Sequence, residues 1–114
     1  MTVIPLENDK KTISQRFRKT DYFALIEDER VKIIKNLHKT SKSKEFFENF
    51  QKLGVKKLYI KALGYKTFLK LESLGIEVYI INDSKLIETI DTSSLTKIEP
   101  SSAESFCTLG HKKK

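Results

Sequence analysis

The sequence is poor in the residues that cross-link a small scaffold or interrupt its elements. Its 114 residues include one cysteine, two prolines, four glycines and no tryptophan. A single cysteine cannot form an internal disulfide, which excludes a disulfide-linked scaffold and agrees with a reducing compartment. No apolar run is long enough to span a bilayer, and the first residues lack the charged start and apolar stretch of a signal peptide. We therefore expect a cytoplasmic protein with no membrane partner.

The sequence also lacks the motifs of common catalytic centres. It has no glycine-flanked serine elbow, no Gly-x-x-x-x-Gly-Lys phosphate loop and no CxxC pair. Only two histidines are present to act as bases or metal ligands. We therefore expect a protein that binds or carries a molecule and is not an enzyme.

Charge is distributed unevenly along the chain. Basic residues exceed acidic ones by 17 to 6 over residues 10–70, whereas acidic residues exceed basic ones by 7 to 2 over residues 71–111. The first part should present a positive potential, which favours an anionic partner. The alternative is an ordinary solvated, lysine-rich surface. With 39% hydrophobic residues, the chain suits one domain with a modest core.

Hydrophobic patterning predicts an α/β domain. One helix is predicted between Ser41 or Ser43, either of which can cap it, and Gly54, which can end it. Asp83 can cap a short last helix. Strands are predicted over residues 3–6, 22–26, 31–37, 56–60 and 76–81, and the other two helices over residues 63–74 and 84–90.

A short motif occurs twice and indicates how the strands connect. Leu53-Gly54-Val55 and, 21 residues later, Leu74-Gly75-Ile76 each lead from a predicted helix into a predicted strand. Such consecutive units favour parallel strands with right-handed crossovers. We therefore predict a mixed five-stranded sheet in the order β-β-β-α-β-α-β-α, antiparallel at first and parallel later. The domain should span residues 1–91, and residues 92–114 are predicted to form a flexible C-terminal tail.

Three segments carry a family resemblance. Residues 3–5 form an opening strand with a proline, and residues 14–23 are similar to the pattern Ser-x-x-Phe-Gly-Arg-Ala-x-x-Phe. Residues 54–79 are similar to a run of Gly-Val, strand, Gly-Gly-Leu-Gly, helix and Gly-Ile-x-Val-Tyr. By the order and spacing of these segments, about residues 1–90 resemble the dinitrogenase iron–molybdenum cofactor biosynthesis family, of the NifX, NafY and NifB C-terminal domain type.

The resemblance implies a ribonuclease H-like fold and a role in nitrogen fixation. It implies that the chain binds or carries an iron–sulphur or iron–molybdenum cofactor, or its precursor, without catalysis. Cofactor-biosynthesis or acceptor proteins would be its partners. The chain departs from the family pattern at Phe17-Arg18-Lys19, where one glycine is replaced, and at Lys61-Ala62-Leu63-Gly64, where two glycines are replaced and a lysine is gained.

Nuclease activity is not expected, although the implied fold hosts two-metal nucleases. Such catalysis needs several carboxylates around two metal ions, with at least one in the first strand. Residues 2–6 contain none, and Asp28 and Asp83 are explained by a turn and a helix cap. Fold alone does not supply function.

Basic residues gather on two predicted loops that can meet at one end of the sheet. One loop follows the first strand, and the other precedes the second helix, whose N-terminal amides and dipole also attract anions. A bulky anionic metallocofactor fits such a site. The candidate cofactor-binding residues are Arg16, Arg18, Lys19, Lys61, Gly64 and Lys66.

The candidate metal ligands lie apart from these loops. Cys107 and His111 stand four residues apart, so a thiolate and an imidazole can reach one soft or borderline metal ion. Two ligands do not close a site, so a third would come from His38, a carboxylate, a second chain or the cofactor itself. The alternative is an unstructured tail with one incidental thiol and a solvated loop histidine.

Two other functions remain open on the sequence. Basic residues interleaved with Phe17, Tyr22 and Tyr65 are compatible with nucleic-acid binding, in which aromatic rings stack on bases. The chain is also compatible with a protein-interaction module that lost its cofactor site together with the family's glycines.

Overall fold

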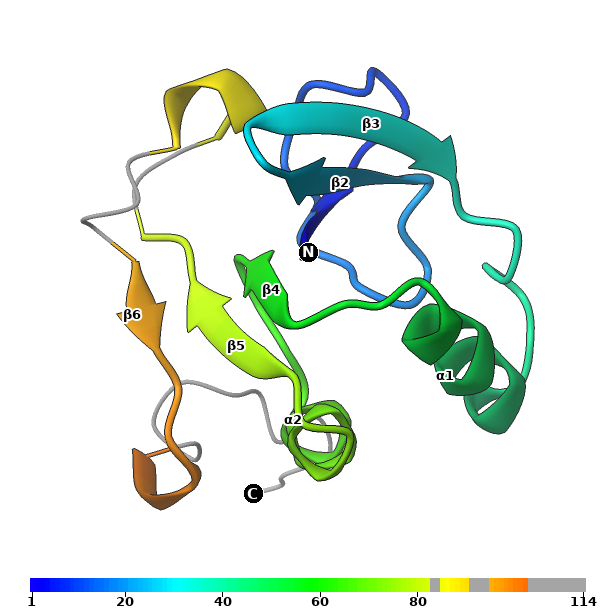
Figure 1. Cartoon of the computed structure of the whole chain (residues 1–114), viewed down its shortest axis with the longest axis vertical. Helices are drawn as coiled ribbons and strands as arrows, with labels where there is room; N and C mark the ends of the chain where they lie inside the picture. The colour runs from blue at the N-terminus through cyan, green and yellow to red at the C-terminus, as the bar shows by residue number, and fades with distance from the viewer. Residues whose placement is uncertain (83–84, 91–94, 103–114) are drawn as a thin grey trace, which may run out of the picture.

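A computed structural model describes residues 1–82, 85–90 and 95–102 of the chain, which form one mixed sheet with two α-helices (Figure 1). The strands are β1 (Thr2–Leu6), β2 (Tyr22–Glu27), β3 (Arg30–Lys35), β4 (Lys57–Ile60), β5 (Glu77–Ile80) and β6 (Thr96–Lys97). The helices are α1 (Ser43–Lys52), α2 (Tyr65–Ser73) and the short 3₁₀ helices η1 (Ile87–Thr89) and η3 (Pro100–Ser102).

The sheet combines antiparallel and parallel pairing in the strand order β3-β2-β1-β4-β5-β6. β1 is antiparallel to β2 and parallel to β4, so Val3 lies between Leu25 and Leu58. β4 and β5 are also parallel, and α1 and α2 provide the crossovers that parallel strands require. The predicted mixed α/β sheet, antiparallel first and parallel later, is therefore confirmed.

The predicted strand count and the last predicted helix are wrong. A sixth strand, β6, pairs antiparallel with β5 inside the range predicted as a tail. The following residue, Ile98, is only 3% exposed and joins the main core, which explains why this segment is held against the sheet. In place of a helix over residues 84–90, the structure has the three-residue η1. The predicted cap, Asp83, lies outside the described residues.

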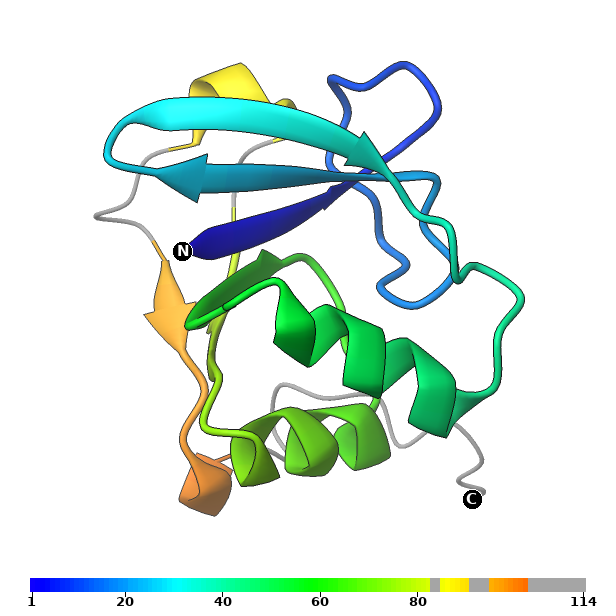
Figure 2. The same ribbon diagram turned by 45° about the vertical axis from the view of Figure 1, so that its right-hand side comes forward.

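Both α-helices cover one face of the sheet and form the main core there (Figure 2). α1 buries Phe46, Phe47 and Phe50, whereas α2 buries Phe68 and Leu71. The spacing of three and four residues places these side chains on one stripe of each helix. Their partners on the sheet are Val3, Phe23, Leu25, Leu58, Ile60, Val78 and Ile80.

The other face of the sheet is covered by irregular segments. Ile4, Leu6, Ile13, Ala24 and Ile81 form a second, smaller core there. The Ile13 N–H donates to Lys85 O at 2.8 Å, and the Ile87 N–H donates to Lys11 O at 2.9 Å. These two bonds join the loop after β1 to the segment that contains η1. Among the helices of the described residues, none has the length and apolar character needed to cross a membrane.

The ends of α1 only partly follow the prediction. The N-cap is Lys42, without a side-chain cap, so the predicted cap by Ser41 or Ser43 is wrong. Gly54 ends the helix as predicted, with φ at +81°. Gly75 follows α2 in the same way, with φ at +79°. Both glycines therefore take the left-handed conformation that side chains disfavour.

Replacement of Gly75 by alanine should lower the free energy of unfolding by about 1–2 kcal/mol, the cost of a left-handed alanine. No described atom lies within 4 Å of the added Cβ, so backbone strain is the only penalty. Urea denaturation followed by circular dichroism measures the change. Gly75→Asn is the matched control and should lose less, because asparagine tolerates this conformation. Equal stability of Gly75→Ala and the native protein would contradict the assignment.

The loop after β1 is held by the carboxylate of Asp9. This carboxylate accepts hydrogen bonds from the Lys11 N–H and the Thr12 N–H, both at 2.8 Å, and from the Thr12 hydroxyl. The Thr12 hydroxyl, the Thr12 N–H and then the Lys11 N–H lower the pKa of Asp9 from 3.8 to about 2. Because folding favours the ionised carboxylate, its stabilisation is present above about pH 4 and is lost as the pH falls through about 2.

Asp9→Asn should therefore reduce the loss of stability between about pH 4 and pH 2, because the variant has no carboxylate to protonate. Urea midpoints at pH 4, 3 and 2 measure this slope. Asp28→Asn removes the same charge from an exposed turn and serves as the control. If the acid slope of Asp9→Asn equals that of the native protein, the carboxylate does not hold the loop.

Candidate anion-binding site

The loop that joins β1 to β2 has a defined shape over residues 14–20. Ser14 and Thr20 are buried at its two ends. The Ser14 hydroxyl accepts a hydrogen bond from the Arg16 N–H at 3.0 Å, and the Thr20 hydroxyl donates to Leu6 O at 2.6 Å. These bonds fix both ends of the loop, so the residues between them bulge out from the sheet. We call residues 15–19 the basic loop.

Phe17 anchors the basic loop to the helix-covered core. Its ring is 6% exposed and meets the rings of Phe46 and Phe50 edge-on, with centroid distances of 5.3 and 5.1 Å. It also lies 6.1 Å from the ring of Phe23 on β2. Because Phe17 points inward, its neighbours Arg16 and Lys19 remain exposed.

The N-terminus of α2 faces the basic loop. Its N-cap is Gly64, in an extended conformation and without a side-chain cap. The Phe68 N–H bonds to Gly64 O at 3.0 Å and begins the helical pattern. The amides of residues 65–67 therefore have no partner within the helix and carry the positive end of its dipole.

A pocket of about 410 Å³ lies between the basic loop and α2. The charged side chains that line it are all basic within the described residues. An open, positively charged pocket beside free helix amides is a site for an anion. Its lining residues are Gln15, Arg16, Phe17, Arg18, Lys19, Ala62, Leu63, Gly64 and Thr67. We call it the loop–helix pocket.

The side chain of Arg18 packs against neighbouring segments and stabilises the basic loop. Its guanidinium donates to Ser41 O at 3.1 Å and lies 5.8 Å from the centre of the Phe46 ring. The Asn36 amide donates in turn to Arg18 O and Thr20 O, both at 2.9 Å. The Arg18 Nε atom is buried and has no hydrogen-bond partner among the described residues. Arg16 and Lys19 are therefore the cations most open to a ligand.

The structure brings four of the six candidate cofactor-binding residues into this pocket, namely Arg16, Arg18, Lys19 and Gly64. Lys61 and Lys66 are not among the described residues that line the pocket, although each is next to a lining residue in sequence. Gln15 and Thr67 line the pocket but were not predicted. Neither residue is charged or a glycine, so neither carries a signal of an anion site in the sequence.

Of the three candidate metal ligands, the structure describes only His38. His38 lies at a different pocket, and its Nδ1 is 3.2 Å from the Ser41 hydroxyl. Cys107 and His111 lie outside the described residues. Within the part of the chain that the structure describes, no three His, Cys, Asp or Glu side chains cluster to hold a metal ion. The described lining of the loop–helix pocket therefore offers a ligand basic side chains and helix amides.

The three aromatic residues that could stack on bases pack against the two cores of the protein. Phe17 is buried, and Tyr65 packs against the main core. Tyr22 packs against the second core, with the Lys10 ammonium 5.0 Å from its ring centre. Stacking on a nucleic-acid base needs an open ring face. The structure therefore gives no support to the nucleic-acid alternative at the basic loop.

Comparison with known protein families shows which family the chain belongs to. A family model described as dinitrogenase iron-molybdenum cofactor matches residues 1–94, which include both walls of the loop–helix pocket. The chain belongs to this family. The resemblance seen in the sequence is thus confirmed, and the membership connects the protein with biosynthesis or carriage of the iron–molybdenum cofactor.

Two solved structures share the fold of this family member. One is an NMR structure of a Thermotoga protein whose description relates it to NifB and to the DUF35 family, with 23% identity and a TM-score of 0.64. The alignment covers 84% of this chain and 90% of that protein. The other is the crystal structure of PH0822, with 22% identity, a TM-score of 0.62 and coverage of 87% and 96%. No curated protein matches the chain.

Proposed function

We propose that the protein binds an anionic iron–sulphur or iron–molybdenum cofactor, or its precursor, in the loop–helix pocket and carries it without chemical change. The observation that supports this proposal most is the composition of the pocket. Arg16 and Lys19 are exposed on one wall, and the uncapped N-terminus of α2 forms the other. Cargo with several negative charges gains from both walls at once.

A carrier function fits the side chains that line the pocket better than catalysis does. Apart from its cations, the described lining offers only Gln15 and Thr67 as polar side chains. Neither serves as a general base near neutral pH, and neither is activated by an adjacent base in the lining. The pocket is therefore suited to hold a ligand by charge and hydrogen bonds, and we infer that the protein is not an enzyme.

Protein ligands to the cargo's metal ions remain part of this proposal. Cys107 and His111 would add a thiolate and an imidazole, and His38 would add a second imidazole. We propose a cytoplasmic location and a donor or acceptor protein of cofactor biosynthesis as the partner. We also propose that the fold is ribonuclease H-like, since the run β3-β2-β1-β4-β5 has its mixed pairing.

Anaerobic titration with iron and sulphide tests the carrier proposal. The native protein and a Cys107→Ala, His111→Ala variant are compared by bound iron and visible absorption. Stoichiometric iron that the variant loses supports a carrier with ligands at these two residues, and iron that both retain supports binding by the loop–helix pocket or His38. If neither protein binds iron, the isolated iron–molybdenum cofactor is titrated next. Failure to bind that cofactor as well would refute the proposal.

A further inference from the structure

The edge of the sheet forms a second surface, which differs from the loop–helix pocket. β3 is the terminal strand of the sheet order, so alternate backbone N–H and C=O groups along it point away from β2. Five of its six residues are exposed, and Val31 is 56% exposed. An exposed strand edge of this length is a template for pairing with another chain.

A small apolar pocket adjoins the end of this strand. It measures about 170 Å³ and lies between β3, the segment after it and α1. Leu37, which also lines this pocket, is 79% exposed and extends its apolar surface outward. The size suits one large apolar side chain. The lining residues are Phe23, Ile34, Lys35, Asn36, Leu37, His38, Phe46, Asn49, Phe50 and Leu53.

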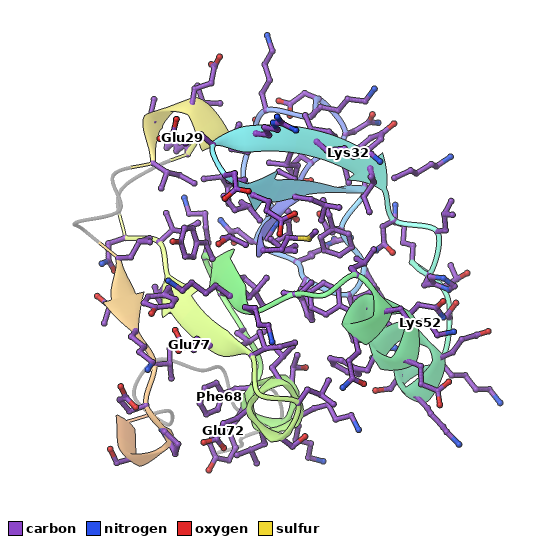
Figure 3. All side chains as sticks on the ribbon, viewed as in Figure 1. Glu29, Lys32, Lys52, Phe68, Glu72 and Glu77 are labelled. Atoms are coloured by element: carbon purple, nitrogen blue, oxygen red, sulfur yellow. The ribbon has the colours of Figure 1, made fainter. Side chains whose placement is uncertain are left out.

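The charge of the edge indicates which kind of chain would pair with it. β3 contains Arg30, Lys32 and Lys35 and no acidic residue. All three are exposed, and Lys35 also lines the apolar pocket. The acidic residues nearest in sequence, including Glu29, are in the turn at the other end of β3, as Figure 3 shows for Glu29 and Lys32. At the end of β3 next to the pocket, Asp21 forms an ion pair with Lys39, so Lys35 leaves this end with a net positive charge.

We propose that β3 and this apolar pocket dock an extended, acidic segment of a partner protein. The segment adds a strand to the sheet and its backbone pairs with β3. Its acidic side chains meet Lys32 on the helix-covered face and Lys35 on the opposite face, because β3 places these two lysines on opposite faces of the sheet. One apolar side chain of the segment enters the pocket beside Leu37. A second copy of this chain fits less well, because pairing of two β3 strands brings three basic residues from each copy together.

The docking surface is distinct from the loop–helix pocket, although His38, a proposed ligand to the cargo, also lines the apolar pocket. Its strand and pocket share no lining residue with the loop–helix pocket among the described residues. Partner binding should therefore be measurable on the protein without any cofactor. The docking proposal can therefore be tested separately from the carrier function.

Labelled heptapeptides test the proposal on the full chain. The probe carries glutamate at both odd and even positions around one central phenylalanine, so that both of its faces are acidic when it is extended. Two matched peptides carry lysine for glutamate or alanine for phenylalanine. Fluorescence anisotropy measures affinity, and amide chemical shifts of the ¹⁵N-labelled protein locate binding. We expect the acidic probe to bind about tenfold more tightly than either matched peptide. Shifts should concentrate on residues 30–38 and 49–53.

Charge reversal supplies the decisive variant. Lys32→Glu, Lys35→Glu should weaken binding of the acidic probe about tenfold, because exposed attractive pairs become repulsive. Lys44→Glu, Lys70→Glu changes the net charge equally on exposed helix positions and should leave binding unchanged. Equal binding by the lysine peptide, shifts elsewhere, or no binding at millimolar concentration would overturn the proposal. Self-association that the Lys32, Lys35 variant abolishes would identify a second copy as the occupant and overturn it too.

Discussion

Reversal of charge at Arg16 and Lys19 should weaken binding of an anionic cofactor about 100-fold. Both side chains are exposed on the wall of the loop–helix pocket, opposite the N-terminus of α2. A hydrogen bond to a charged group contributes roughly 1.5–3 kcal/mol, and about 1.4 kcal/mol corresponds to a tenfold change in affinity. Loss of two such contacts gives the expected factor. Anaerobic titration of Arg16→Glu, Lys19→Glu with isolated cofactor measures it.

The same variant should fold as stably as the native protein, because exposed side chains without a core contact contribute little. Lys44→Glu, Lys70→Glu carries the same change in net charge away from the pocket and separates local attraction from the overall field. Its affinity should fall by much less. Equal losses in the two variants would mean that net charge, and not the loop–helix pocket, attracts the cofactor.

Truncation of Phe17 should produce the largest loss of stability at the site. The ring is 6% exposed and packs edge-on against two rings of α1. Replacement of a buried phenylalanine by alanine costs roughly 3–5 kcal/mol, since apolar contacts are lost and a cavity remains. Phe17→Ala should therefore lower the urea midpoint strongly. It should also weaken cofactor binding, because Arg16 and Lys19 lose the anchor between them.

Two further variants make this result specific. Phe17→Leu keeps most of the buried volume and should lose less stability than Phe17→Ala. Leu69→Ala removes a side chain that is 41% exposed on α2 and should change stability by only about 0.5 kcal/mol. Should Phe17→Ala unfold at the same urea concentration as Leu69→Ala, the basic loop is not anchored in the core.

Much of the fold was predictable because the central strands are apolar and the helices are amphipathic. Gly54 and Gly75 marked both helix ends, since each needs a positive φ. β6 escaped prediction because it has two residues, Thr96 and Lys97, and only the neighbouring Ile98 is buried. Short strands at a sheet edge are stabilised by tertiary contacts, which leave little local pattern.

The helix prediction for the segment that contains η1 was wrong for a related reason. A short helix over residues 84–90 was predicted with Asp83 as its cap, but the backbone there bonds to the loop after β1 instead. The Ile87 N–H is committed to Lys11 O, a partner distant in sequence. Local spacing cannot reveal such a competing partner.

The candidate site was only partly predictable from charge. Arg16 and Lys19 were identifiable as cations on a loop, and Gly64 as a helix start. The different role of Arg18 depends on Ser41 and Phe46, which the fold brings to it from another element. Predictions for Cys107 and His111 lie outside the described residues and stay predictions.

The most direct test of the central claim is to locate bound cofactor by paramagnetic broadening of amide signals in the ¹⁵N-labelled protein. Unpaired electrons on a bound cluster broaden the signals of nearby amides most strongly. We expect broadening to centre on residues 15–19 and 62–67, the two walls of the loop–helix pocket. Broadening centred on the pocket around His38, or on no defined surface, would contradict the assignment of the cofactor to the loop–helix pocket.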